Sequence, residues 1–211
     1  NPHNPLGTTM PAEAVRELVS WARRNEIHLI SDEVYAFSAH SPAGGAPFAS
    51  VASVTEQLGD WVHVVYGFSK DFCMSGFRVG LCYTENRAVH AALDNISYFC
   101  AVSNHTQHAL TRLLAPDDDE GFVQRFIDAN AARLRQAYEA LAAALAAARL
   151  PHIAPCAGLF AMVDMRTLLD APGSWAAEAR LFKELLACGV LMTPGADCHM
   201  DEPGWFRCCP A

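Results

Sequence analysis

Six polar side chains lie close to where apolar stretches of the sequence end, and together their types could bind and activate one small ligand. Ser69 and Lys70 follow the apolar run WVHVVYGF, and Arg78 lies inside another apolar stretch shortly after. Charged residues rarely occur in core-like sequence without a partner. A lysine amine can form a Schiff base with a carbonyl compound, and a hydroxyl with a guanidinium can hold a phosphate. The six residues are Asn4, Asp32, Tyr35, Ser69, Lys70 and Arg78.

One ligand, pyridoxal 5'-phosphate, would use all six. Its carbonyl needs an amine, and its ring nitrogen needs a carboxylate that keeps it protonated. Its ring oxygen needs hydrogen-bond donors, and its phosphate needs a hydroxyl and a guanidinium. The lysine meets the first need, the aspartate the second, the asparagine and tyrosine the third, and the serine with the arginine the fourth.

Each residue taken alone also has a plain structural interpretation. Asp32 could cap the turn after its strand, and Asn4 could be a turn residue. Tyr35 could be a core aromatic with a hydrated hydroxyl. Lys70 and Arg78 could be surface residues with apolar stems. The set as a whole is much harder to explain in this way, so we prefer the ligand interpretation.

The elements that must position these residues alternate between strand, helix and loop, which predicts an α/β sheet with helices over its faces. In such sheets ligands bind outside the carboxyl ends of the strands, where these side chains would converge. Hydrophobic spacing at residues 15, 18, 19 and 22 predicts a helix. We expect helices over 11–24 and near 51–58, and strands within 27–35, 61–69 and 77–84.

The second half of the sequence turns helical and then predicts a smaller module. A stripe of apolar residues over 121–149 predicts one long, alanine-rich helix. The stretch from 151 onward predicts the order β, α, β, β. We therefore expect an α/β module over 1–115, and a long helix with a smaller α+β module over 116–211.

Composition excludes several classes of protein. The net charge of −8 over 211 residues argues against nucleic acid or an anionic membrane as the main partner, and no apolar run is long enough for a transmembrane helix. The eight cysteines form no CxxC pair, so we expect buried free thiols in a reducing compartment. The nine histidines show no metal-binding spacing, and we expect no metal site.

The two ends of the sequence suggest a piece of a longer protein. The first residue is Asn1 rather than methionine, and the last residues stop within an expected strand. Nothing at the start has the pattern of a signal peptide. Cytoplasmic localisation is therefore only the default expectation.

Four segments occur in an order and at a spacing that resemble a known family. NPHNPLG, SDEVY, SKDFCMSGFRVG and EPGWFR are similar to the signature segments of class I/II aminotransferases, the fold-type-I enzymes that use pyridoxal phosphate. NPLGTT, HVVYGFSKDF, GFRVG, AGLF and DEPGWFRCC are most similar to 1-aminocyclopropane-1-carboxylate (ACC) synthases and ACC-synthase-like proteins. The resemblance covers the whole chain and implies the C-terminal half of such a protein. It implies part of a large domain with a mostly parallel sheet, followed by a smaller α+β domain.

The resemblance also implies residue roles. Lys70 would hold the cofactor and, once substrate replaces it in an external aldimine, would remove the α-proton. Arg207, in GWFRCC, would clamp the α-carboxylate of the substrate, although a surface ion pair is its structural alternative. The roles implied for the other five residues agree with those assigned above from their chemical types.

These roles imply an enzyme that acts on an amino acid, and the parent protein would be a homodimer. We favour transamination. The alternatives are an ACC synthase, which converts S-adenosylmethionine to ACC, and a truncated product without turnover. A cysteine-based metal or redox protein is a third and weaker interpretation.

Overall fold

The computed structural model describes residues 1–40, 46–115 and 121–210, which divide into two compact units. The first unit takes in Asn1–Pro2, Thr9–Ala39 and Ala46–Ala131. The second unit takes in the rest of the described chain, including His3–Thr8. The domain boundary expected between residues 115 and 116 stays a prediction.

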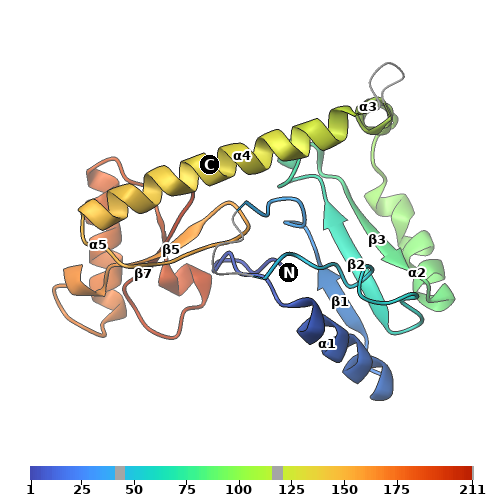
Figure 1. Ribbon diagram of the computed structural model, residues 1–211, viewed down its shortest axis with the longest axis horizontal. Helices are drawn as coiled ribbons and strands as arrows, with labels where there is room; N and C mark the ends of the chain where they lie inside the picture. Colours follow the sequence, from blue (N-terminus) through green and yellow to red (C-terminus); the bar gives the residue numbers. More distant parts are fainter. Residues whose placement is uncertain (41–45, 116–120, 211) are drawn as a thin grey trace. The chain divides into compact units, whose positions relative to one another are not determined.

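The first unit contains a three-stranded sheet in the order β1-β2-β3 (Figure 1). Strand β1 (Leu29–Asp32) runs parallel to β2 (Val62–Gly67), and β3 (Gly80–Thr84) runs antiparallel to β2. Three valines in β2 suit a pleated and largely covered strand. Because β1 and β2 are parallel, both end at the same edge of the sheet, and β3 begins there.

Helix α1 (Ala12–Arg24) buries its apolar stripe against this sheet. Val15, Val19 and Ala22 recur at helical spacing and are at most 2% exposed. The two valines pack in one core with Val62 and Val64 of β2. The helix predicted over 11–24 is thus confirmed, with Pro11 just before its first turn.

The remaining elements of the first unit follow the sheet. Side-chain caps explain two helix starts, because Asn86 and Ser103 accept hydrogen bonds from free backbone amides of the following turn. Phe72 and Phe126 stack with their ring centroids 5.6 Å apart, which packs α4 on the turn after β2. The elements are η1 (Ser75–Phe77), α2 (Arg87–Ser97), η2 (Tyr98–Cys100), α3 (Asn104–Leu114) and α4 (Phe122–Ala147) as far as Ala131.

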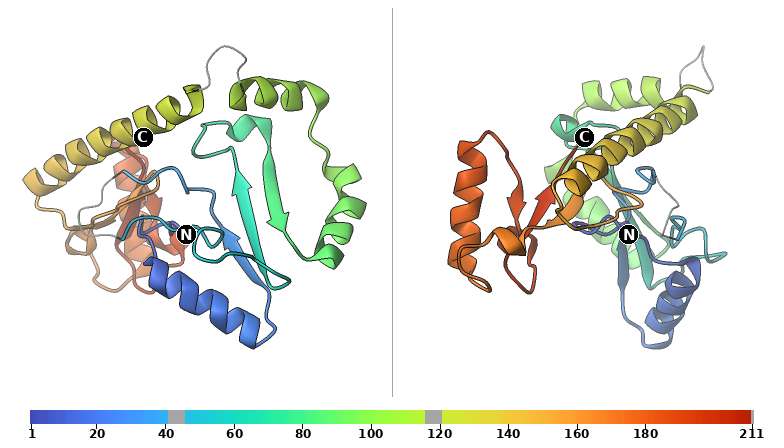
Figure 2. Two further views of the ribbon diagram at one scale, coloured as in Figure 1. Left: turned by 45° about the vertical axis from the view of Figure 1, so that its right-hand side comes forward. Right: turned by 60° about the vertical axis from the view of Figure 1, so that its left-hand side comes forward.

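The second unit contains an antiparallel sheet in the order β4-β5-β7-β6, visible beside α5 in Figure 2. Phe206, Val163 and Leu181 lie in its core with the C-terminal part of α4. Ser174 caps α5 by accepting from the amide of Ala177. The elements are β4 (His152–Ile153), β5 (Ala161–Asp164), η3 (Arg166–Leu168), α5 (Trp175–Ala187), β6 (Thr193–Pro194), η4 (Gly195–Cys198) and β7 (Trp205–Cys208).

The helix expected near 51–58 is wrong, because residues 51–56 form turns and bends. Ser53 donates from its hydroxyl and its amide to the carbonyl of Ser50, and Thr55 donates to the carbonyl of Gln57. Such local side-chain bonds compete with helical hydrogen bonds. The serine and threonine hydroxyls therefore favour turns here.

The cysteines are free, as expected, but most of them are not buried. Cys156 is buried, whereas Cys73, Cys82, Cys100, Cys188 and Cys209 are exposed, so the expectation of buried thiols is wrong for five positions. Apolar sequence neighbours do not ensure burial, since Leu81 and Tyr83 beside Cys82 and Phe99 beside Cys100 are exposed as well. Within the described residues, no helix is long and apolar enough to cross a membrane.

Candidate active site

Three of the predicted site residues line one pocket of about 300 Å³ in the first unit. Asp32, Ser69 and Arg78 supply a carboxylate, a hydroxyl and a guanidinium to its wall. The remaining lining consists of valines, two glycines and Tyr66. The fold thus brings these three polar groups together at the sheet edge where β1 and β2 end.

The sheet register explains this convergence. Asp32 is the last residue of β1, and Gly67 is the last residue of β2, paired with Gly80 at the start of β3. A side chain at Gly80 would bring its Cβ within 3.0 Å of the carbonyl of Tyr66, so close strand approach favours glycine there. The small residues leave room in front of the sheet edge, and the turns after the strands carry the polar groups.

Arg78 occupies an unusual backbone conformation at the rim of this pocket. Its φ of 52° lies in the left-handed region, which costs energy for a residue with a side chain. Its Nη1 donates to the carbonyl of Ser75 at 3.2 Å, and the neighbouring carbonyl of Val79 accepts from the amide of Phe68 at 3.2 Å. These bonds hold the arginine beside the turn that follows β2. Backbone strain of this kind is often found at functional sites.

Lys70 and Tyr35 lie in the two turns that follow the strands but do not line the pocket. Tyr35 is only 8% exposed, and its carbonyl accepts from the hydroxyl of Ser38 at 2.7 Å. Lys70 is half-buried, and its carbonyl accepts from the amide of Cys73 at 3.1 Å. The two predicted residues are therefore placed next to the pocket-lining positions in sequence, on well-bonded turns.

Sequence reasoning missed Asp71, whose side chain is buried beside Lys70. Its Oδ2 accepts from the amide of Phe37 at 3.0 Å and from the hydroxyl of Tyr66 at 3.2 Å. Burial raises the pKa of Asp71 to about 6, although both hydrogen bonds lower it. Burial, with Asp71 close by, also raises the pKa of Tyr66. The signal in the sequence was an acidic residue directly before Phe72 in an apolar region.

In the second unit, the side chains of Asn4 and Arg207 form a hydrogen-bonded pair. Nη1 of Arg207 donates to Oδ1 of Asn4 at 3.0 Å, and Nη2 donates to the hydroxyl of Thr193 at 3.2 Å. The guanidinium carbon lies 5.8 Å from the ring centroid of Phe160. Nε of Arg207 is buried and has no hydrogen-bond partner among the described residues. Buried donors without a partner are rare in folded proteins.

The position of Arg207 follows from strand alternation. Its neighbours Phe206 and Cys208 pack into or against the core of the second unit, so the arginine points to the other face of β7. Both adjacent strands pair with it, β5 through Met162 and β6 through Thr193. A central strand therefore holds the arginine, while the threonine of the next strand reaches its guanidinium.

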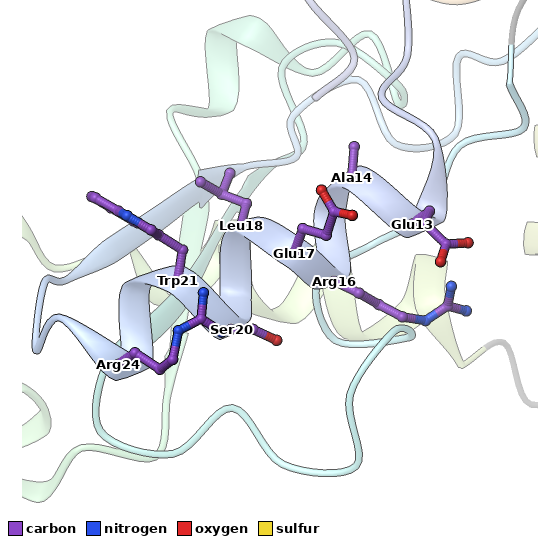
Figure 3. Close-up of a pocket in the computed structure, with 8 residues that line it drawn as sticks. All are labelled: Glu13, Ala14, Arg16, Glu17, Leu18, Ser20, Trp21 and Arg24. Carbon is purple, nitrogen blue, oxygen red and sulfur yellow. The ribbon is translucent and has the colours of Figure 1, made fainter.

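A larger hollow of about 640 Å³ follows helix α1 and contains none of the predicted site residues. Figure 3 shows that its labelled side chains all arise from this single helix. Glu13, Arg16, Glu17 and Arg24 give it charges of both signs, as expected for the solvated face of an amphipathic helix. Trp21 adds an exposed aromatic to that face. We assign this hollow no role in the active site.

Comparison with known proteins identifies relatives over the whole chain. The family model described as aminotransferase class I and II matches residues 1–211. ACC synthase 4 of Oryza sativa subsp. japonica is 42% identical over 232 residues, and the match covers 99% of this chain and 45% of that protein. ACC synthase 11 of Arabidopsis thaliana is 38% identical, with 99% and 45% covered. The chain thus spans about half the length of these relatives.

Solved structures show the same fold at lower identity. An aspartate aminotransferase from Thermotoga maritima matches with a TM-score of 0.80 and 22% identity, over 99% of this chain and 50% of the other. An aromatic aminotransferase from Pyrococcus horikoshii matches with a TM-score of 0.80 and 20% identity, over 100% and 53%. These likenesses confirm the expected α/β fold.

Proposed function

Because this chain belongs to the class I and II aminotransferase family, we propose that it forms part of an enzyme that uses pyridoxal 5'-phosphate to react an amino acid at its α-carbon. The observation that carries the proposal is the shared pocket of Asp32, Ser69 and Arg78 beside the turn of Lys70. Its carboxylate, hydroxyl and guanidinium are the groups that the ring nitrogen and the phosphate of this cofactor require.

The residues present fit the cofactor in chemical type. Ser69 and Arg78 would bind the phosphate, the arginine with a charge-assisted fork. Asp32 would accept a hydrogen bond from the protonated ring nitrogen. Asn4 and Tyr35 would bind the ring oxygen, for which the asparagine still has its Nδ2 donor while its Oδ1 accepts from Arg207.

Lys70 would hold the cofactor through its Nζ and later carry the substrate proton. When bound, the cofactor supplies an electron sink that makes the α-proton of an amino acid acidic. The free amine of Lys70 would then take that proton as a general base. Asp32 would keep the cofactor ring cationic, which strengthens the acidifying effect.

Arg207 would bind the α-carboxylate of the substrate. Its hydrogen bonds to Asn4 and Thr193, together with the ring of Phe160, fix the plane of the guanidinium. Nη1 and Nη2 each carry a second N–H group, and these would bind the carboxylate oxygens. Preorganised donors reduce the entropy lost when the substrate binds.

Two reactions share these first steps. We favour transamination, while the names of the curated relatives support ACC formation as the second candidate. Incubation with S-adenosylmethionine and an assay for ACC tests one reaction. Incubation with an amino acid and a 2-oxo acid acceptor, followed by an assay for the new 2-oxo acid, tests the other. ACC as the product would support the second candidate, and a 2-oxo acid would support transamination. We further propose that the complete protein is a homodimer, which sedimentation velocity would test.

The decisive experiment is to locate the covalently held cofactor. The chain contains only two lysines, Lys70 and the exposed Lys183. Borohydride reduction of the cofactor-loaded complete protein, followed by peptide mapping, should label Lys70. Lys70→Ala should abolish both the label and turnover, whereas Lys183→Ala should retain both. No label on Lys70 in the parent protein would contradict the proposed function.

A further inference from the structure

The carboxyl group of Asp71 joins two turns that the proposed function places at the active site. Asp71 is only 1% exposed. Oδ2 accepts from the amide of Phe37, in the turn after β1, and from the hydroxyl of Tyr66, in β2. Its other oxygen, Oδ1, is buried and has no hydrogen-bond partner in the described part of the chain.

Two of the three segments that meet at this carboxyl group carry predicted site residues. Lys70 directly precedes Asp71, and Tyr35 lies two residues before Phe37. The backbone of Asp71 is also held, since its carbonyl accepts from Nδ2 of Asn130 at 3.4 Å. A single side chain therefore ties the lysine turn to the tyrosine turn and to the strand between them.

A purely apolar side chain would have been the simpler choice for packing at this place. The surroundings include Phe37, Phe68 and Phe72, whose rings contact Tyr66 or one another. Burial of a carboxyl group with one unbonded oxygen is unfavourable. Phe37 offers a backbone amide and Tyr66 offers a hydroxyl, and an acceptor is needed to join them. The carboxyl group supplies that acceptor, which an aliphatic residue cannot do.

We infer that Asp71 is a positioning residue that holds the turn of Lys70 in register with the turn of Tyr35. This inference rests on the proposed function, because it concerns where the amine of Lys70 is presented. Asp71 itself does not need to touch substrate or cofactor. Its two accepted hydrogen bonds set the geometry through which the neighbouring lysine acts.

The test compares variants of Asp71 by the site of labelling rather than by turnover. The complete protein is treated with pyridoxal phosphate and borohydride, and mass spectrometry gives the ratio of label on Lys70 to label on Lys183. Asp71→Leu should lower this ratio at least about tenfold, because both hydrogen bonds are lost. Asp71→Asn keeps an acceptor oxygen and should stay within about threefold of the parent.

Two further variants separate positioning from general loss of stability. Tyr66→Phe removes one of the two bonds, keeps the ring, and should lower the ratio by an intermediate amount even if Asp71→Leu does not fold. Glu33→Gln alters another buried acid of the same unit, which binds the amide of Val51, and should leave the ratio unchanged. The inference would be overturned if folded Asp71→Leu or Tyr66→Phe labelled like the parent, or if Glu33→Gln lost as much label. Absence of label on Lys70 in the parent would instead overturn the proposed function.

Discussion

The amide oxygen of Asn4 accepts a hydrogen bond of 3.0 Å from Nη1 of Arg207, although 203 positions separate the two residues in the chain. Thr193 accepts from the other terminal nitrogen, and the ring of Phe160 lies near the guanidinium. The guanidinium plane is therefore set before any substrate binds. A planar, preorganised fork suits a carboxylate better than a flexible ammonium group does.

We expect Arg207→Lys to raise the KM for the amino-acid substrate by about 30- to 150-fold, because a charge-assisted pair of hydrogen bonds contributes about 2–3 kcal/mol. The labelling of Lys70 by pyridoxal phosphate should change little. Arg180→Lys is the matched control, since Arg180 is an exposed arginine that pairs with Asp170. Steady-state kinetics on both variants would check this, and an unchanged KM for Arg207→Lys would contradict the substrate role.

Much of the first unit could be predicted because its signals are local. The run ending in Asp32 combines β-forming residues with a following turn, and parallel strands bring their ends to one edge. The contact between Asn4 and Arg207 could not be found in this way. It depends on the pairing of β5, β6 and β7, which is set by tertiary packing rather than by local sequence.

Asp71 was missed for a related reason. An acidic residue next to a lysine has the pattern of a solvated surface pair, and only the three-dimensional structure shows that Phe37 and Tyr66 enclose it. The helix expected near 51–58 is wrong because the hydroxyls of Ser53 and Thr55 bond to nearby carbonyls. Both cases concern side chains that bond to backbone or to distant residues.

Asp71 should make the stability of the protein depend on pH. Its pKa is raised from 3.8 to about 6, so the folded state holds a proton that the unfolded state has already released. This contribution is fully present below about pH 4 and is lost as the pH rises through about 6. Asp71→Asn does not titrate, so its free energy of unfolding relative to the parent should rise by about 2 kcal/mol between pH 4 and 7.

Urea unfolding at several pH values would measure this difference. Tyr66→Phe serves as the control, because the Tyr66 hydrogen bond lowers the pKa of Asp71 and its loss should move the transition to higher pH. Parallel curves for Asp71→Asn and the parent from pH 4 to 7 would show that Asp71 does not titrate in this way.

Glu178 should be important for the stability of the second unit. This residue of α5 is 1% exposed, and its carboxylate accepts from the amide of Ala196 at 3.0 Å and from that of Gly204 at 2.5 Å. Glu178→Leu would leave two backbone amides without these partners, and we expect a loss of about 2–5 kcal/mol in unfolding free energy. Glu178→Gln retains one acceptor and should lose less.

The close packing around the Glu178 carboxylate leaves no room for a side chain at position 195. A Cβ at Gly195 would lie 2.9 Å from the carbonyl of Trp205 and 3.2 Å from Oε2 of Glu178, so glycine is needed for the approach. Glu184→Gln, on an exposed position of the same helix, provides the matched control and should change stability by less than about 0.5 kcal/mol. Equal losses of unfolding free energy for Glu178→Leu and Glu184→Gln would show that the two hydrogen bonds from backbone amides to Glu178 do not contribute to stability.

The final prediction concerns the phosphate of the cofactor. If Arg78 binds it, Arg78→Lys should raise the Kd for pyridoxal phosphate by roughly 10- to 100-fold, because lysine lacks the planar fork. The Kd for pyridoxal, which has no phosphate, should hardly change. Lysine is the suitable replacement because both residues bear a Cβ and experience the same backbone strain at a φ of 52°. Arg16→Lys, on the exposed face of α1, should affect neither ligand. Fluorescence titration with both ligands measures these two dissociation constants. If binding of both ligands weakens equally, Arg78 maintains the conformation of its turn and does not bind the phosphate.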